Sequence, residues 1–313
     1  MRTVDQKLAQ HLTDILIKFD QDKHHLPGIR NPLALAVYVE QLLESIRRVK
    51  YVSLLKNREL DERCVNPNDE LFDPIKAAIV HIKNGNIDEA FWLTFLLTHF
   101  GKHRIAGWQY LKDIYGQHGS GRLWIWKRIC KNTDGFRTWL SENQDLIKRK
   151  NPRHGFGNHR KYQSLDAYSA KGTGSTIVSY VHWIGESHQH REIFELATQE
   201  ASGNPKKAFH LLYKSMNQVI GFGRTGRFDY LTMVGHLGLA EIEPGLAYLQ
   251  NSTGPIKGAK LLFTGSVNRR ISTSELEFLL SELNNDLGVG MQALEDSLCN
   301  WQKSPDRFIK FRG

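Results

Sequence analysis

The sequence predicts an all-α protein, and three observations support this fold class. Apolar residues recur three or four positions apart, so they lie on one face of a helix. Proline and capping residues stand where these periodic segments begin. Runs of alternating β-branched residues, which are typical of strands, are scarce.

The N-terminal half contains four segments with clear helical signals. One stripe of residues 4–19 consists of Leu8, Leu12, Ile15, Leu16 and Phe19. Pro32 opens a second helix and Asp73-Pro74 a third, because proline suits the first helical turn. Asp88 is expected to cap the helix that contains the apolar residues 90–100.

The second half continues in the same way. Residues 121–132 and 206–220 repeat the helical spacing. Between them, Lys171–Thr176 does not satisfy the GxxxxGK[ST] pattern of a phosphate loop. We expect this segment to begin a helix capped by Thr173 or Ser175, with a DNA or substrate contact as the alternative.

The composition favours a negatively charged partner. The 313 residues include 42 Lys and Arg against 33 Asp and Glu, for a formal charge of +9. Such an excess suits nucleic acid or an acidic membrane surface. Residues 1–25 are charged throughout, unlike a signal peptide, and the most apolar stretch, residues 90–97, is too short to cross a bilayer. We expect a soluble, cytoplasmic protein.

Neither the cysteines nor the histidines form a recognisable metal site. The three cysteines are widely spaced and lack a CxxC pair, which argues against a disulfide framework and a zinc site. His188 and His190 lie two positions apart, the wrong spacing for a helical ligand pair. We therefore expect no metal, and a surface or linker role for His182, His188 and His190.

Residues 148–161 interrupt the helical pattern with a basic segment. Lys or Arg occupies six of these 14 positions, and Phe156 and Tyr162 accompany the charges. Aromatic rings beside cations are typical of a nucleic-acid contact, so Arg160 and Lys161 are candidate DNA-binding residues. A solvated linker explains the segment equally well.

The same segment suggests a domain organisation. We predict an N-terminal helical lobe over residues 1–147 and a basic linker or DNA-contact loop over residues 148–162. A C-terminal helical lobe then occupies residues 163–313.

The most informative stretch is VIGFGRTGRFDYL, residues 219–231. Gly221, Gly223 and Gly226 spell GxGxxG, but a dinucleotide-binding fingerprint needs a strand before its first glycine. Residues 206–220 have helical spacing instead, so the dinucleotide interpretation is unlikely.

A helix-hairpin-helix over about residues 206–235 explains these glycines better. Two glycines around one apolar residue permit a sharp turn, with Phe222 anchored in the core. Exposed N–H groups at the start of the next helix would then bind a DNA phosphate. An ordinary glycine turn between packed helices is the alternative. The candidate DNA-binding residues of the hairpin are Gly221, Gly223, Arg224, Thr225 and Arg227.

This stretch resembles the hairpin of the helix-hairpin-helix DNA glycosylase superfamily. The resemblance implies a catalytic carboxylate about twenty residues past the second glycine, which falls on Glu243, with Glu241 as its neighbour and fallback. Lyase-type members carry a lysine where this sequence has Thr225. The resemblance thus implies a water-using, monofunctional reaction.

A second resemblance covers the chain from about residue 85 to its end. It is carried by residues 89–103, 155–165, the hairpin, 243–250 and 288–305. Together they are similar to the alpha-glutamyl/putrescinyl thymine pyrophosphorylase family, clade three. That family is a helical relative of the DNA glycosylases, associated with hypermodified phage bases, and related proteins of phage-defence loci are thought to excise modified bases.

These resemblances imply a two-lobed, DNA-glycosylase-like fold and an enzyme that flips a modified pyrimidine out of double-stranded phage DNA and excises it. The base pocket would use Tyr162, Trp183 and Trp301. We expect a monomer without a cofactor. A transferase that attaches an amine to an activated hydroxymethyl pyrimidine is the main alternative, and a non-enzymatic DNA-binding module is the third. Glu295 or Asp296 is a weaker candidate for a second catalytic carboxylate, since a solvated face or a structural salt bridge explains both.

Overall fold

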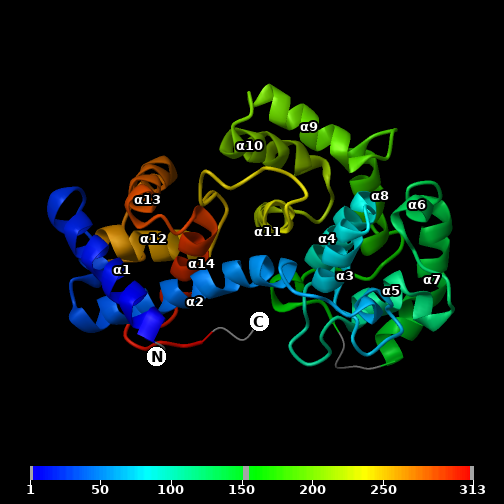
Figure 1. The fold of residues 1–313 in the computed structure, drawn as a ribbon, viewed down its shortest axis with the longest axis horizontal. Helices are drawn as coiled ribbons and strands as arrows, with labels where there is room; N and C mark the ends of the chain where they lie inside the picture. Colours follow the sequence, from blue (N-terminus) through cyan, green and yellow to red (C-terminus); the bar gives the residue numbers. More distant parts are fainter. Residues whose placement is uncertain (1–2, 151–154, 311–313) are drawn as a thin grey trace. The chain divides into compact units, whose positions relative to one another are not determined.

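The computed structural model describes residues 3–150 and 155–310, and these residues confirm the all-α prediction. Beyond two isolated β-bridges, the described residues form helices, short 3₁₀ turns and loops (Figure 1). The chain divides into two compact units: unit 1 combines residues 1–51 with 244–312, and unit 2 contains residues 52–243.

Each helix belongs mainly to one of the two units. Unit 1 contains α1 (Thr3–Asp22), most of α2 (Pro32–Lys56), α12 (Gly254–Thr264), α13 (Thr273–Leu287) and α14 (Met291–Trp301). Unit 2 contains α3 (Pro74–Lys83), α4 (Ile87–Phe100), α5 (Gln109–Tyr115), α6 (Trp126–Ile129), α7 (Thr133–Lys150), α8 (Thr173–Ile184), α9 (His190–Glu200), α10 (Pro205–Ser215) and α11 (Arg224–Leu237).

This division differs from the expected boundary at residues 148–162. Unit 1 is built from both ends of the described chain, because α1 packs against α13 and one apolar core is shared by residues 12–46 and 247–301. Trp301 is fully buried in that core, with its ring centroid 4.9 Å from the ring centroid of Tyr38. A division read along the sequence could not detect this long-range packing.

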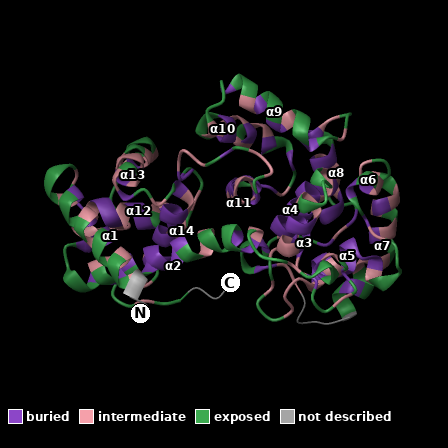
Figure 2. Cartoon of the chain, viewed as in Figure 1, coloured by how far each residue is buried: buried purple, intermediate pink, exposed green. Residues whose placement is uncertain are grey.

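Unit 2 is organised around α4. Every residue from Ala90 to Phe100 is buried, because the helix is apolar on almost all of its faces (Figure 2). The Phe95 ring stacks on Tyr180 of α8 at 3.7 Å and on Phe222 at 4.9 Å between centroids. The aromatic core thus joins α4 to the glycine turn before α11.

Two of the predicted helix starts are confirmed and two are corrected. Pro32 begins α2, and the Asp73 carboxylate accepts the N–H groups of Ile75 and Lys76 at the start of α3. The residue before α4 is Asn86, and Asp88 lies inside the first turn.

The start of α8 also differs, since Gly172 precedes it without a side-chain cap. Backbone carbonyls replace the cap: Ser164 O accepts the Thr173 N–H at 2.8 Å, and Asp166 O accepts the Gly174 N–H at 3.0 Å. Because these N–H groups are occupied, this helix start is poorly suited to phosphate binding. No helix in the described part of the chain combines the length and apolar character needed to cross a membrane.

Candidate nucleic-acid interface and catalytic residues

The glycine turn joins two helices of unit 2. After α10, the chain forms a 3₁₀ turn at Met216–Gln218, turns through residues 219–223 and enters α11 at Arg224. Phe222 is 4% exposed and stacks on Phe95, so the predicted anchoring of the turn by this side chain is confirmed. We call residues 219–223 the glycine turn.

Gly221 is required by the fold of the turn itself. Its φ of 78° lies in the left-handed region, where a side chain is strained. A Cβ there would lie 2.9 Å from Gln163 Oε1 and 3.0 Å from Thr176 Oγ1. Gln163 Nε2 also donates to the Gly221 carbonyl at 3.0 Å, which ties the residues just after the basic segment to the turn.

Gly223 has no such internal requirement. Its φ of −67° suits any residue, a Cβ would meet nothing within 4 Å, and the residue is exposed. Gly223 immediately precedes α11, whose first-turn N–H groups lack carbonyl partners within the helix. A glycine here leaves those N–H groups open to an approaching anion.

The two hairpin arginines are held by local contacts. Arg224 is 9% exposed and its guanidinium lies 4.9 Å from the Phe228 ring centroid. Arg227 lies 4.2 Å from the Tyr213 ring centroid and donates to the Tyr213 carbonyl at 3.1 Å and to Asn217 Oδ1. Thr225 is half-buried at the start of α11. Both arginines thus already have partners within unit 2.

In the described part of the basic segment, Arg160 is buried, whereas Lys148, Arg149 and Lys161 are exposed. Residues 151–154 lie outside the described residues. Arg160 is 7% exposed, donates to Thr98 O at 2.7 Å and pairs with Asp229 of α11 at 2.9 Å. Burial lowers the pKa of Arg160, and Asp229 partly offsets this effect. Arg160 therefore holds α11 against α4 rather than facing a ligand, which differs from the expected DNA contact.

Lys161 and Tyr162 face solvent beside the glycine turn. Tyr162 is 89% exposed, and Lys161 Nζ lies 5.0 Å from its ring centroid. Both residues lie within two positions of Gln163, whose side chain holds the turn. Tyr162 thus lies on an open surface and not in a pocket, in contrast to the expectation from the sequence.

A chain of buried hydrogen bonds connects Tyr230 of α11 to Asp88 of α4. The hydroxyls of Tyr230 and Tyr180 are 2.8 Å apart, and the Tyr180 hydroxyl lies 2.8 Å from His190 Nε2. His190 Nδ1 lies 2.7 Å from Asp88 Oδ1. Burial alone would raise the pKa of Asp88, but its hydrogen bonds from His190 outweigh this effect and lower it. The expected surface role is thus wrong for His190, which is fully buried.

The carboxylate candidates lie in the loop after α11. Glu243 follows α11 by six positions; its side chain is 58% exposed and its Oε1 lies 3.9 Å from Lys206 Nζ. Its N–H donates to Pro205 O at 3.4 Å, so Glu243 adjoins the start of α10, while the glycine turn follows the end of α10. Glu241 is also exposed.

The two remaining base-pocket candidates lie in different cores. Trp183 is 3% exposed in unit 2, and its Nε1 donates to Ser215 Oγ at 3.0 Å. Trp301 is fully buried in unit 1. Neither ring is exposed enough to stack on a flipped base, because close packing already covers both.

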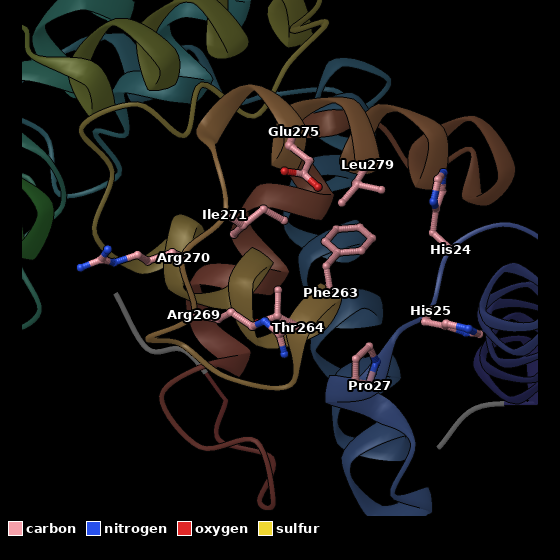
Figure 3. Close-up of a pocket in the computed structure, with 10 residues that line it drawn as sticks. All are labelled: His24, His25, Pro27, Phe263, Thr264, Arg269, Arg270, Ile271, Glu275 and Leu279. Carbon is pink, nitrogen blue, oxygen red and sulfur yellow. The ribbon is translucent and has the colours of Figure 1, made fainter.

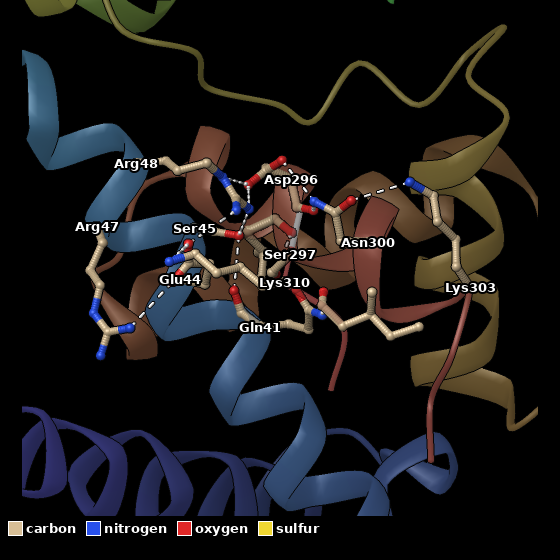
Figure 4. A network of polar contacts seen from close by, with 12 residues as sticks. Gln41, Glu44, Ser45, Arg47, Arg48, Asp296, Ser297, Asn300, Lys303 and Lys310 are labelled. Carbon is tan, nitrogen blue, oxygen red and sulfur yellow. Dashed lines mark hydrogen bonds and ion pairs between the residues drawn. The ribbon is translucent and has the colours of Figure 1, made fainter. Parts of the chain in front are cut away.

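Asp296 of unit 1 forms a structural ion pair. Arg48 of α2 donates from Nε to Asp296 Oδ2 at 3.1 Å and from Nη2 to the same oxygen (Figure 4). Asn300 Nδ2 donates to Asp296 Oδ1 at 3.0 Å, and Lys303 Nζ donates to Asn300 Oδ1 at 3.2 Å. This network ties α14 to α2 and explains the acidic residue without a catalytic role.

Unit 1 also contains a cavity of about 480 Å³. His24, His25, Arg269 and Glu275 contribute polar groups to its lining, and Phe263 contributes an aromatic ring (Figure 3). This volume falls in the range of small-molecule sites, about 300–1,000 Å³. None of the residues predicted from the sequence is among those that line it.

Comparison with known protein families gives a match over most of the chain. The model of the family described as alpha-glutamyl/putrescinyl thymine pyrophosphorylase clade 3 matches residues 34–313. The chain belongs to this family. No curated protein and no solved structure matches it.

The clade 3 match extends over both units of the chain. The family's name denotes pyrophosphorylase chemistry on a modified thymine. In this member of the thymine pyrophosphorylase family, two features were not predicted from the sequence. One is the contact of Gln163 with the glycine turn, and the other is the hydrogen-bond chain from Asp88 through His190 and Tyr180 to Tyr230. Single polar residues in separate helices carry no spacing signal, so only the fold reveals that they meet.

Proposed function

We propose that this protein binds double-stranded DNA at the glycine turn and acts on a modified pyrimidine base. Gly223 is the observation that supports the proposal most directly. The fold requires no glycine at that position, whereas a phosphate approaching the start of α11 would. The exposed Lys161 adds a cation beside the same turn, and the net charge of +9 favours a polyanion.

The reaction that we favour is hydrolysis of the N-glycosidic bond. The enzyme would flip the base, and the C1′–N1 bond would break with its electron pair leaving on N1. Water would add to C1′, and its proton would pass to a carboxylate and on to the departing base, while the same carboxylate stabilises the positive charge that develops on the sugar. We assign that carboxylate to Glu243, with Glu241 as fallback. Thr225, in place of a lysine, favours water as the nucleophile.

Pyrophosphate displacement is the second candidate, and the family name favours it. An amine would attack the methylene carbon of a pyrimidine that carries a diphosphate ester, and pyrophosphate would leave with the C–O bonding electrons. Glu243 would then accept the proton from the amine. Both reactions need a DNA surface and an accessible base, so binding assays cannot separate them. By resemblance, we expect the substrate to be modified phage DNA and the excision to act in phage defence.

Product analysis separates the candidates. The protein would be incubated with normal and modified phage genomes, followed by alkali cleavage and nucleoside mass spectrometry. Alkali-labile sites support excision, and a base with an added amine supports transfer. Folded protein that binds DNA but yields neither product would favour the non-enzymatic binding module.

The carboxylate is tested by matched variants. Glu243→Gln is expected to lower product formation about 100-fold or more, because the charged group is lost. Glu200→Gln changes an exposed glutamate at the end of α9 and should leave the rate unchanged. Loss of activity in Glu241→Gln with normal activity in Glu243→Gln would move the role to Glu241.

A further inference from the structure

The cavity of unit 1 is lined by three segments that are distant in sequence. His24 and Pro27 lie after α1, Phe263 lies near the end of α12, and Glu275 and Leu279 belong to α13 (Figure 3). We call this space the unit 1 cavity, because every residue that lines it belongs to unit 1. It shares no residue with the glycine turn or with the loop after α11, so the proposed function does not account for it.

The walls of the unit 1 cavity are closely packed. A Cβ on Gly28 would lie 2.2 Å from Leu261 O, so the segment after α1 lies directly against α12. Ser272 Oγ accepts the Glu275 N–H at 3.1 Å, which fixes the first turn of α13. A cavity with walls of this kind is largely preformed, and a ligand that enters it loses little affinity to ordering of the protein.

Two cations lie at one end of the unit 1 cavity. Arg269 and Arg270 follow α12 in the chain and are both exposed, and neither forms an ion pair within the described part of the chain. Figure 3 shows the Arg269 side chain beside Thr264, whereas Arg270 points outward. A guanidinium can bind two phosphate oxygens with parallel N–H groups, so this end suits a phosphate held mainly by Arg269.

Aromatic rings lie at the other end. The ring of His24 is half-buried and meets the ring of Phe278 nearly edge-on, with centroids 6.2 Å apart. Phe278 belongs to α13 and is 58% exposed. The Phe263 ring lies between His24 and the arginines in Figure 3. An exposed aromatic ring offers a face on which a planar base can stack.

A carboxylate lies between these two ends. Glu275 is exposed, and Figure 3 shows its carboxylate between Arg269 and His24. It forms no ion pair with a residue that the structure describes, Arg269 included. A carboxylate accepts hydrogen bonds from hydroxyl groups, such as those of a ribose, and repels a bare anion. The ligand must therefore carry hydrogen-bond donors as well as negative charge.

We propose that the unit 1 cavity binds a free ribonucleotide. Arg269 binds its phosphate, Glu275 accepts hydrogen bonds from its ribose hydroxyls, and the base stacks beside His24. These groups follow one another along the cavity in the order phosphate, sugar and base, and the volume of about 480 Å³ accommodates a small molecule. An inorganic anion would leave Glu275 and the rings unused, and an apolar ligand would leave Arg269 without a partner.

Isothermal titration calorimetry of the full chain without DNA tests this site. The probes are AMP, GMP, CMP and UMP, and at least one should bind with a Kd on the order of 10–100 µM. For the nucleotide that binds best, removal of its phosphate should weaken binding about tenfold, because one charge-assisted contact is lost. Its 2′-deoxy analogue should bind about fivefold more weakly, because one hydrogen bond to Glu275 is lost.

Matched variants assign these contacts to the cavity. Arg269→Ala should weaken nucleotide binding about tenfold and leave binding of the nucleoside within about twofold. Glu275→Gln should bring the preference for the ribonucleotide over its deoxy analogue close to one. Arg307→Ala and Glu40→Gln change exposed residues of unit 1 outside the cavity, and both should keep the wild-type affinities.

Three results would overturn the nucleotide site. The first is the absence of binding by all four nucleotides, and the second is an unchanged nucleotide affinity in both Arg269→Ala and Glu275→Gln. The third is displacement of the nucleotide by a 20-base-pair duplex, combined with a tenfold loss of duplex affinity in Arg269→Ala, which would assign the arginines to DNA. Nucleotide binding by a protein that does not bind duplex would instead contradict the proposed function and leave the unit 1 site intact.

Discussion

Gly221 and Gly223 lie two positions apart, yet they face different physical constraints. Gly221 has a left-handed φ of 78° and side chains of Gln163 and Thr176 within 3.0 Å of a Cβ position. Gly223 has an ordinary φ and open space around it. Internal packing therefore explains the first glycine but not the second, which the proposed function would explain by an approaching phosphate.

The same substitution at both positions should separate stability from binding. Gly221→Ser is expected to lower the free energy of unfolding by about 1–3 kcal/mol, because of the strained φ and the close contacts. Gly223→Ser should keep or slightly raise stability, since serine is a good N-cap, but its hydroxyl would occupy the N–H groups that a phosphate needs. Urea denaturation and anisotropy with a 20-base-pair duplex measure the two effects. Unchanged DNA affinity in Gly223→Ser would contradict the proposed interface.

At the scale of elements, Glu89 joins three helices of unit 2. Its carboxylate on α4 accepts the Tyr115 hydroxyl at the end of α5 and the Trp126 N–H at the start of α6, both at 2.7 Å. Burial raises the pKa of Glu89 to about 7, although both hydrogen bonds favour the charged form. The packing of α5 and α6 on α4 is thus coupled to protonation of the Glu89 carboxylate.

This coupling predicts a dependence of stability on pH. The native state holds the Glu89 proton more tightly than the unfolded chain, whose ordinary pKa is 4.5. The stabilisation is therefore complete below pH 4.5 and is lost as the pH rises to about 7, by up to roughly 3 kcal/mol. Urea midpoints of the wild type and Glu89→Gln across pH 4.5–8 measure the difference, which should be constant for the exposed Glu192→Gln control. The comparison also removes the opposite effect of His99, whose pKa burial lowers to about 3. Parallel curves for the wild type and Glu89→Gln would contradict this prediction.

Local signals predicted the elements better than the site. Pro32 and Asp73-Pro74 act within one helical turn, so the sequence locates those helix starts. Arg160 shows the limit of such signals: a cation in a basic segment resembles a phosphate ligand, but the fold buries it against Thr98 and Asp229. Trp183 and Trp301 show the same limit: both rings are buried, because long-range packing decides which face of an aromatic ring is open. The DNA-binding and catalytic assignments of the glycine turn and Glu243 stay predictions.

At the scale of the whole molecule, unit 1 is built from both ends of the described chain and needs both of them to fold. Residues 12–46 and 247–301 contribute to one core, so neither part can bury its apolar face without the other. Unit 2, in contrast, is continuous over residues 52–243 and has its own aromatic core. The division into these two units depends on side-chain packing between helices that are distant in sequence, and local periodicity does not reveal such packing.

Fragments test this dependence. Residues 244–310 alone are expected to lack a cooperative thermal transition, because fewer than about 70 residues with half of a core are marginal. Mixing them with residues 1–56 should restore helical circular dichroism and slow amide exchange, whereas residues 52–243 should unfold cooperatively by themselves. Cooperative unfolding of residues 244–310 in isolation would contradict the shared core.

The shared core of unit 1 also has a consequence during synthesis on the ribosome. Residues 1–51 emerge before unit 2, and their partners in α13 and α14 follow more than 200 residues later. At about 5–20 residues per second, the apolar stripe of α1 waits roughly 10–50 s for its partners. Unit 2 can fold in that interval, while Leu12, Leu16 and Phe19 remain targets for chaperones and for aggregation. Translation speed should therefore affect the yield of unit 1 more than that of unit 2.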